Sequence, residues 1–339
     1  MTTTAPHAEG TRAPALPPDR GDLSAAVTAR LRGRSGALPG PGAVAAADPY
    51  GEDVQLALHL GYELHYRGFA DVPDAAEWDL GLLRLRALLE DRFEEALREE
   101  CAGSATPAEV FDGLLTEPPD GGGVSRHLMR HGTLEQLREH AVLRSAHQLR
   151  ESDPQAWVLP RLRGRAKAGM ATVLYDEFGA GREERVHARL YAGLMRALGL
   201  DPGHGHYLPV IGAPALATAN VMSLFGLHRA HRGALVGHFA VLEITSPPAA
   251  SWLAAALRRC GAGEDAARYY DEHVEADAVH EQLVRREVVG GLLAEEPGLA
   301  ADVAFGARAT VLLEDVLAEA VTTAWRSGGT ALRAPIEEA

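Results

Sequence analysis

The chain has 339 residues, of which 46% are hydrophobic and 24% are charged, and its formal net charge is −14 at pH 7. This length allows one large core with additional structure around it. The acidic balance argues against a broad surface for nucleic acid or for an anionic membrane, because both need clustered Lys and Arg. We therefore expect no nucleic acid and no membrane among its partners.

Residues 1–46 are rich in Ala, Pro, Gly, Thr and Arg, which predicts a disordered tail. Residues 47–124 are predicted to form an accessory helical segment that ends at the EPPDGGG run, a strong helix breaker. Residues 125–327 are predicted to form the main helical domain, and residues 328–339 a second tail.

Apolar residues recur at helical spacing through most of the chain from residue 78 onwards. Thr133 with Gln136 resembles a capping box that opens a helix ending before Pro154. No alternating strand pattern is present, so the predicted fold class is all-α, a helical bundle. The further helices are expected near 160–178, 182–198, 213–229, 233–246, 249–260, 264–289 and 300–325.

The two cysteines, Cys101 and Cys260, form neither a CxxC pair nor a disulfide framework. The first 48 residues carry no apolar segment behind a basic start, so we expect no secretory signal. No run of about 18 apolar residues is present, which predicts no transmembrane helix. These features together predict a reduced, cytoplasmic protein.

The strongest candidate for chemistry is the triplet His273, Asp277 and His280. Its spacings of four and three residues place the side chains within an arc of roughly 60° on one helix face. Tyr270 and Val284 extend the same stripe and indicate that it faces the core. Ionisable groups there are costly to bury unless compensated, and a divalent metal with two imidazoles and a carboxylate does so. The alternative is a solvated face with chance histidines.

Glu177 and His187 each place a polar side chain on an otherwise apolar helix face, and a Gly-Ala-Gly hinge between them could let them converge. Taken singly, each is more often structural than a metal ligand. Glu184 competes with Glu177, because Glu184-x-x-His187 has the spacing of ferritin-like diiron proteins. We favour Glu177, since acidic residues at a helix start, as Glu184 is, are stabilised by the helix dipole alone.

Two further glutamates are candidates. Glu243 shares a helix face with Phe239, where a buried carboxylate needs a metal, an arginine or an opening to solvent. Glu151 shares a polar stripe with Arg144, so a solvated face or an ion pair with Arg144 competes with a metal-binding role. Glu139 is a weaker competitor for the same role.

Other patterns carry less weight. His204 and His206 flank a glycine in a Gly/Pro loop and could chelate a metal, but we favour flexible surface histidines. The sequence has no GxGxxG, P-loop or GxSxG motif, so nucleotide binding and a serine-hydrolase elbow find no support.

Taken in order, Glu151, Glu177, His187, Glu243 and the His-x3-Asp-x2-His triplet resemble the haem-oxygenase-like diiron oxidases and oxygenases. Local strings are similar to the actinobacterial branch called iron-containing redox enzymes. The resemblance covers about residues 130–325 and not obviously residues 1–125. The strings are ESDPQAWVLPRLRGRAKA (151–168), DEFGAGREERVHARLYAGLMRALGLD (176–201), NVMSLFGLHRAHRGALVGHFAVLEITS (220–246) and YYDEHVEADAVHEQ (269–282).

The resemblance implies a seven-helix haem-oxygenase-like bundle with an N-terminal helical extension, two Fe(II) ions per chain, and O2 as co-substrate. It implies that Glu177 bridges the irons, and that Glu177 and Glu243 act in catalysis by shifting coordination mode. His147 stands where the family leads us to expect an aromatic residue. The resemblance assigns His187, Glu243 and His273 to one iron and Glu151, Asp277 and His280 to the other.

The resemblance further implies an oxygenase or oxidase in natural-product biosynthesis. Its expected substrate is a small amine or amino-acid derivative, changed by N-oxygenation, desaturation or C–C cleavage. The expected partners are this small molecule, an external electron donor and a second copy in a homodimer. Three alternatives remain open at this point: a metal-free enzyme on the same fold, an iron-binding or storage protein, and a non-enzymatic interaction module.

Overall fold

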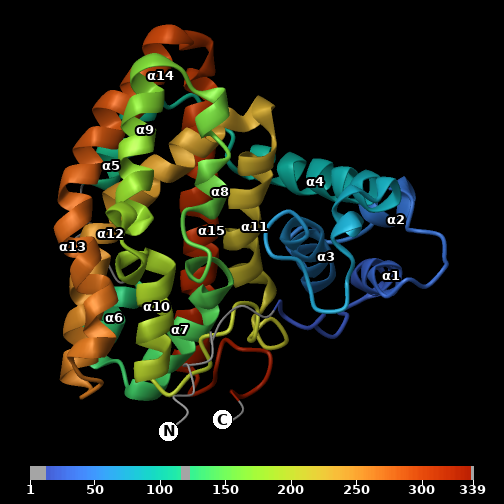
Figure 1. The fold of residues 1–339 in the computed structure, drawn as a ribbon, viewed down its shortest axis with the longest axis horizontal. Helices are drawn as coiled ribbons and strands as arrows, with labels where there is room; N and C mark the ends of the chain where they lie inside the picture. Colours follow the sequence, from blue (N-terminus) through green and yellow to red (C-terminus); the bar gives the residue numbers. More distant parts are fainter. Residues whose placement is uncertain (1–12, 116–122, 337–339) are drawn as a thin grey trace, which may run out of the picture.

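The structure, a computed structural model, describes residues 13–115 and 123–336, apart from the side chains of residues 275–279. Every regular element in these ranges is a helix, so the all-α prediction is confirmed. The longer helices form a bundle, and α1 to α4 lie together against one side of it (Figure 1). No helix in the described ranges has both the length and the apolar character needed to cross a membrane.

The N-terminal group packs on its own apolar stripes. Its helices are α1 (Asp22–Leu31), α2 (Pro41–Ala45), α3 (Glu52–Glu63), the 3-10 helix η1 (Asp74–Trp78) and α4 (Leu80–Glu100), whereas α5 (Pro107–Leu114) packs against α12 and α15 of the bundle. Leu23, Val27 and Leu31 of α1 are buried. Asp53 of α3 accepts hydrogen bonds from the backbone N–H groups of Leu23 and Ser24, at 2.9 and 2.7 Å, and so closes the start of α1.

The expected disorder of residues 1–46 is corrected for residues 13–46, which hold α1 and α2. The Ala, Gly and Pro content hid one apolar stripe at four-residue spacing, and this stripe becomes stable only against a partner helix. Residues 1–12 lie outside the described part of the chain.

The bundle follows from residue 124. Its α-helices are α6 (Val124–His131), α7 (Leu134–Gln148), α8 (Asp153–Ala156), α9 (Gly164–Glu177), α10 (His187–Ala197), α11 (Ala213–Leu227), α12 (Arg232–Arg259), α13 (Glu264–Leu283), α14 (Gly290–Glu295) and α15 (Ala300–Arg326). The short elements between them are the 3-10 helices η2 (Leu159–Arg161), η3 (Gly179–Gly181), η4 (Glu183–Arg185), η5 (Arg229–His231) and η7 (Pro297–Leu299), and the π-helix η6 (Val284–Val289). The predicted capping box of Thr133 and Gln136 opens α7.

Helix α12 is central and packs closely against α13, α15 and α6. Its N-terminal half is buried on nearly every face, as expected for a helix that is apolar all round. Two glycines bring α12 and α15 into backbone contact. A Cβ atom at Gly237 would lie 1.9 Å from the Val303 carbonyl oxygen, and one at Gly306 would lie 2.0 Å from the Ala234 carbonyl oxygen.

The sequence predicts two helices, at 233–246 and 249–260, but the structure has a single α12 that runs through Pro247 and Pro248. A proline has no backbone N–H to donate to the carbonyl four residues earlier. The backbone carbonyls of Glu243 and Ile244 therefore lose the N–H donors that a regular helix would provide. The helix continues because both halves are buried against α13 and α15, which outweighs the local loss.

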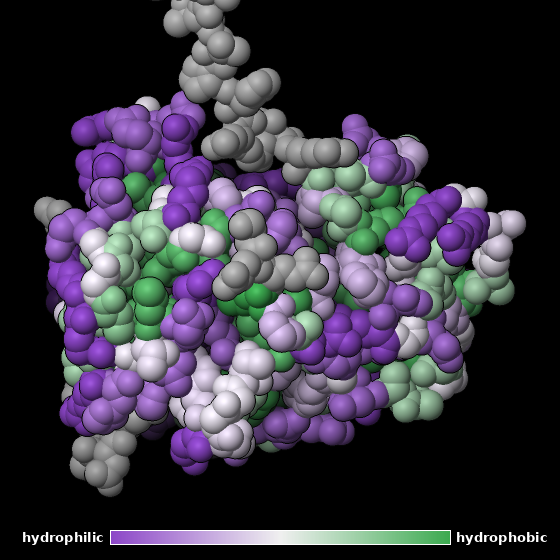
Figure 2. All heavy atoms as spheres, turned by 90° about the horizontal axis from the view of Figure 1, so that it is seen from below, coloured by the Kyte–Doolittle hydropathy of each residue, from purple (hydrophilic) through white to green (hydrophobic). Residues whose placement is uncertain are grey.

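A buried polar network joins α3 to the bundle. Glu63 accepts a hydrogen bond from His204 Nε2 at 2.9 Å, and its Oε2 lies 3.9 Å from Arg150 Nη1. The guanidinium of Arg150 stacks 4.1 Å from the ring centre of Tyr66. His204, expected on the surface, is therefore buried and structural, while His206 is exposed. The face seen in Figure 2 carries many hydrophilic side chains with hydrophobic patches between them.

Candidate metal centre

Four helices and one turn bring six carboxylate and imidazole side chains together inside the bundle. Glu177 ends α9, His187 begins α10, Glu243 lies in α12, and His273 and His280 lie in α13. Glu151 lies in the turn after α7. The six side chains fall into two groups of three, and within each group the ligand atoms lie within 4.8 Å of one another.

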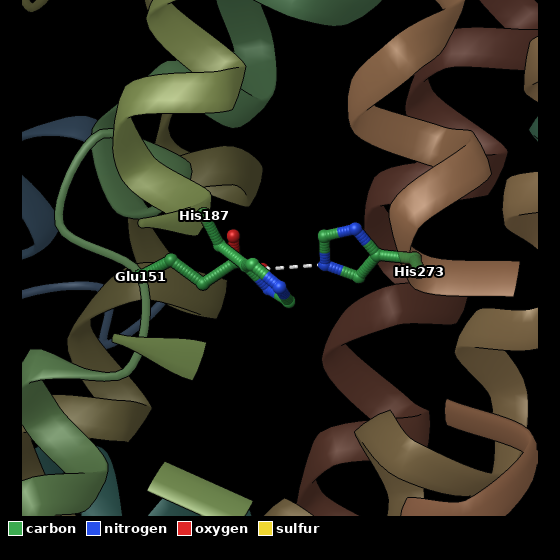
Figure 3. Close-up of side chains that lie close together, drawn as sticks. All are labelled: Glu151, His187 and His273. Atoms are coloured by element: carbon green, nitrogen blue, oxygen red, sulfur yellow. Dashed lines mark ion pairs between the residues drawn. The ribbon is translucent and has the colours of Figure 1, made fainter. Parts of the chain in front are cut away.

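The first group consists of Glu151, His187 and His273. Nε2 of His273 lies 3.4 Å from Oε1 of Glu151. The rings of His187 and His273 lie 4.4 Å apart, centre to centre. Figure 3 shows His187 and His273, from two helices, and Glu151, from the turn after α7, directed towards one another.

The second group consists of Glu177, Glu243 and His280, all buried. Nδ1 of His280 lies 3.4 Å from Oε2 of Glu243 and 3.9 Å from Oε1 of Glu177. Glu177 also joins the two groups, because its Oε2 lies 3.2 Å from Nδ1 of His187. Glu177 thus stands between them, with one oxygen directed to each.

A left-handed turn makes Glu177 and His187 converge. Gly179, Ala180 and Gly181 have φ values of 79°, 51° and 80°. Tyr175 donates a hydrogen bond from its hydroxyl to the Ala180 carbonyl at 2.9 Å. Two glycines make this backbone path accessible, and Ala180 is the strained position. The hinge proposed from the sequence is therefore present as a fixed turn.

Hydrogen bonds orient both α13 histidines. Nδ1 of His273 donates to the Tyr269 carbonyl at 2.8 Å, which directs Nε2 towards Glu151. Nε2 of His280 contacts Asp176 Oδ2 at 3.2 Å, which leaves Nδ1 facing Glu177 and Glu243. Partners of this kind fix the tautomer and orientation of metal-binding histidines.

The carboxylates are held in the same way. Ser152 donates to Oε2 of Glu177 at 2.8 Å, and the Tyr269 hydroxyl donates to both oxygens of Glu151 at 3.0 Å. Ser152 has a φ of 66°, an uncommon conformation for a residue other than glycine. The turn that carries Glu151 is therefore strained where it points two side chains into the centre.

Electrostatics favour a charged carboxylate at Glu177. Burial alone would raise its pKa, but the neighbouring His187 and His273 and the hydrogen bonds from His187 and Ser152 lower the pKa to about 2. Burial would lower the pKa of His187, yet the Glu177 charge raises it. Nδ1 of His187 is buried and lies 3.2 Å from Oε2 of Glu177. A cation between these groups would satisfy both, so the residues fit a metal.

The other sequence candidates lie elsewhere. Glu184 is exposed, and Glu139 accepts a hydrogen bond from the Ala331 backbone N–H at 2.7 Å, so it fixes the C-terminal segment. Asp277 lies in α13, but its side chain is outside the described residues. Arg144 pairs with Glu314 and does not neutralise Glu151.

The grouping differs from the one that the resemblance implies. Glu151 lies with His187 and His273, whereas the resemblance assigns it to His280. Glu243 lies with His280, whereas the resemblance assigns it to His187 and His273. The exchange follows from the fold, because His273 lies two helical turns before His280 on α13 and reaches the Glu151 turn first.

A cavity of about 800 Å³ adjoins the centre. Its wall includes Glu151, Glu177, Glu243 and His273, and it extends between α7, α12 and α15. Apolar side chains such as Phe239 form much of this wall. Small-molecule sites are commonly concave and apolar with a few placed polar groups, and this cavity has that character.

A family profile described as iron-containing redox enzyme matches residues 138–315, which is more than half of the chain. The chain belongs to the iron-containing redox enzyme family. The family supports an oxidoreductase that uses iron on the all-α haem-oxygenase-like fold. Both groups of carboxylates and imidazoles fall within the matched residues. The chain has no significant match to a curated protein.

Sequence reasoning missed three residues of this iron-containing redox enzyme that contact the six: Asp176, Ser152 and Tyr269. Asp176 and Ser152 are direct sequence neighbours of Glu177 and Glu151, and Tyr269 precedes His273 by one helical turn. Position next to a candidate ligand was thus a signal. Only the fold shows, however, that Asp176 serves a histidine on another helix.

Proposed function

We propose that this protein is a non-haem diiron enzyme that activates O2 to oxidise a small amine or amino-acid-derived substrate. The observation that carries the proposal is the pair of three-residue groups joined by Glu177. Two sites that share one carboxylate are what a dinuclear centre needs. Carboxylates and imidazoles suit Fe(II) and leave coordination positions open.

Iron bound at this centre would supply the electrons that reduce O2. The protein's own residues would hold and orient its ligands. Asp176 fixes the ring of His280, the Tyr269 carbonyl fixes His273, and Ser152 with the Tyr269 hydroxyl fixes the two carboxylates. We assign Glu151, His187 and His273 to one iron, and Glu243, His280 and Asp277 to the other, with Glu177 between them.

The cavity supports a substrate-oxidising role over iron storage. It has room for a small organic molecule directly against Glu151, Glu177 and Glu243. A storage protein needs an ion path but no pocket of about 800 Å³ lined by Phe239 and Trp252. We place the enzyme in natural-product biosynthesis as part of the same proposal, with N-oxygenation, desaturation and C–C cleavage as the candidate reactions.

The test is to load the apoprotein with Fe(II) without oxygen, count irons per chain, and record the visible spectrum after rapid mixing with O2. We expect about two irons per chain and a transient charge-transfer band. The Glu177→Gln variant should bind at most one iron, while Glu184→Gln, its exposed neighbour, should match the wild type. One iron or none in the wild type, or two in Glu177→Gln, would contradict the proposal.

A further inference from the structure

An ion pair lies in the wall of the cavity, away from the six candidate ligands. Arg144 of α7 donates from Nη1 and Nη2 to the two oxygens of Glu314 of α15, at 2.6 and 2.5 Å. Both residues line the cavity, and their side chains keep exposed fractions of 20% and 30%. The pair therefore presents charged surface inside the bundle, in the cavity that also reaches Glu151 and Glu177.

Both members of the pair stay charged. Burial opposes the charge on each, but mutual attraction raises the pKa of Arg144 and lowers the pKa of Glu314. His140 and His147, one helical turn on either side of Arg144, are neutral, because burial lowers the pKa of each to about 3. Among these three α7 side chains, Arg144 is thus the one that carries a positive charge into the cavity. The negative charge of Glu314 lies directly opposite it.

The pair has unused hydrogen-bonding capacity. Arg144 donates one N–H of each Nη to Glu314, so its Nε–H and two further N–H groups remain as donors. Each oxygen of Glu314 retains one lone pair. Among the described residues, neither side chain forms a further hydrogen bond or ion pair. A buried ion pair that served the fold alone would be no better than apolar packing, so a ligand role explains its exposure to the cavity.

We propose that Arg144 and Glu314 bind the α-carboxylate and the α-ammonium group of an amino-acid substrate. The guanidinium matches a carboxylate, and the Glu314 carboxylate accepts from an ammonium group. An α-amino acid carries these two charges side by side, as the pair does. A fatty acid would leave its single carboxylate beside Glu314, and a simple amine would leave nothing for Arg144.

The proposal rests on the proposed function and names its substrate class. Arg144 lies four residues, about 6 Å along the helix axis, before α7 ends at Gln148, and Glu151 lies in the turn beyond that end. A head group held at Arg144 therefore leaves the substrate side chain, and not the α-ammonium group, to extend towards the candidate metal centre. The ion pair therefore sets the orientation of the substrate, and the candidate metal centre acts on the end of the substrate side chain.

The test uses four amino acids and their decarboxylated counterparts: L-lysine and cadaverine, L-arginine and agmatine, L-leucine and isoamylamine, L-tyrosine and tyramine. Each is titrated into the anaerobic, Fe(II)-loaded protein and followed by calorimetry. We expect at least one amino acid to bind roughly tenfold or more tightly than its decarboxylated counterpart, the effect of a charge-assisted contact.

The decisive variant is Arg144→Gln/Glu314→Gln, because it removes both charges and leaves no unpaired buried charge that would unfold the protein. It should lose the preference for the amino acid while its circular dichroism and iron count stay unchanged. The matched control is Arg258→Gln/Glu264→Gln, which neutralises an exposed ion pair and should keep the preference.

Two results would overturn this site: no amino acid preferred over its counterpart by a protein that binds two irons, or a preference kept by the double variant. The iron count separates the two proposals. A protein without iron that still prefers amino acids through Arg144 and Glu314 would support this site and contradict only the diiron function.

Discussion

Asp176 Oδ2 lies 3.2 Å from Nε2 of His280, so a carboxylate outside the six candidate ligands fixes one of them. We expect Asp176→Asn to lower Fe(II) affinity by about 10- to 100-fold, because such partners set the ring orientation and raise its basicity. Competition with a chromogenic chelator measures this directly. Circular dichroism should stay unchanged, since the Asp176 side chain is 44% exposed.

Glu184→Gln is the matched control for Asp176→Asn, because Glu184 is an exposed acidic residue in the same region of the chain. It removes a similar charge and should leave iron affinity within error of the wild type. Equal losses in the two variants would mean that general electrostatics, and not the contact with His280, governs affinity.

Breaking the buried network at α3 should destabilise the whole protein. Glu63 and Arg150 are 0% and 1% exposed, so Glu63→Ala leaves a buried guanidinium without its carboxylate. We expect the free energy of unfolding to fall by about 3–5 kcal/mol. Urea denaturation measures it. Glu63→Gln/Arg150→Met should lose clearly less, and an additive loss in this double variant would show that the two residues act independently.

The apoprotein should lose stability on mild acidification. Burial lowers the pKa of His59, His140 and His147 to about 3 and that of His238 to about 4. Below about pH 6.5 the unfolded chain binds these protons and the folded chain does not, so stability falls as the pH drops. Each histidine adds up to about 1.4 kcal/mol per pH unit.

Urea titrations at pH 7.5, 6.5 and 5.5 test this dependence. Glu63, whose pKa is lowered to about 2 because His204 and Arg150 outweigh burial, contributes stability that is lost only below about pH 4.5. The titration of Glu63 therefore does not obscure the loss of stability that the histidines cause between pH 7.5 and 5.5. His238→Gln should reduce the slope by about one proton, whereas substitution of the exposed His206 by Gln should not. A flat profile from pH 7.5 to 5.5 would contradict the prediction.

Replacing two glycines by alanine should change the stability in opposite directions, because Gly306 lies in the contact between α12 and α15 and Gly193 does not. Gly306→Ala would place a Cβ atom 2.0 Å from the Ala234 carbonyl oxygen, so two helices must separate, and we expect a loss of about 1–3 kcal/mol or more. Gly193→Ala in α10 meets nothing within 4 Å and should stabilise the protein by about 0.5–1 kcal/mol. Shifts of the urea midpoint in the same direction would be inconsistent with this packing.

The fold was predictable where periodicity and caps are local properties. The capping box at Thr133 and the apolar stripes of α4 and α15 are visible in the sequence. The continuity of α12 through Pro247 was not, because it depends on burial against other helices. The same holds for α1, whose stripe is too short to form a stable helix without α3.

The candidate site was predictable as a set of residue types, and its roles stay predictions until metal is measured. The spacing of His273 and His280 identified them as candidate ligands, because it places them on one helix face. It did not show that they face different carboxylates, because two helical turns separate them and the surrounding turns decide which group each one meets. Partners on other helices, such as Asp176, have no periodic signal at all.

The link between Glu63 and Arg150 also bears on how such a chain can evolve. Residues 63 and 150 lie on opposite sides of the boundary that the sequence suggests near 124, yet each neutralises the other in the interior. Recombination at that boundary would separate two compensating charges, so α3 and the bundle must be inherited together. Among related chains, positions 63 and 150 should therefore change in concert, and the N-terminal helices should be lost only where both charges are lost.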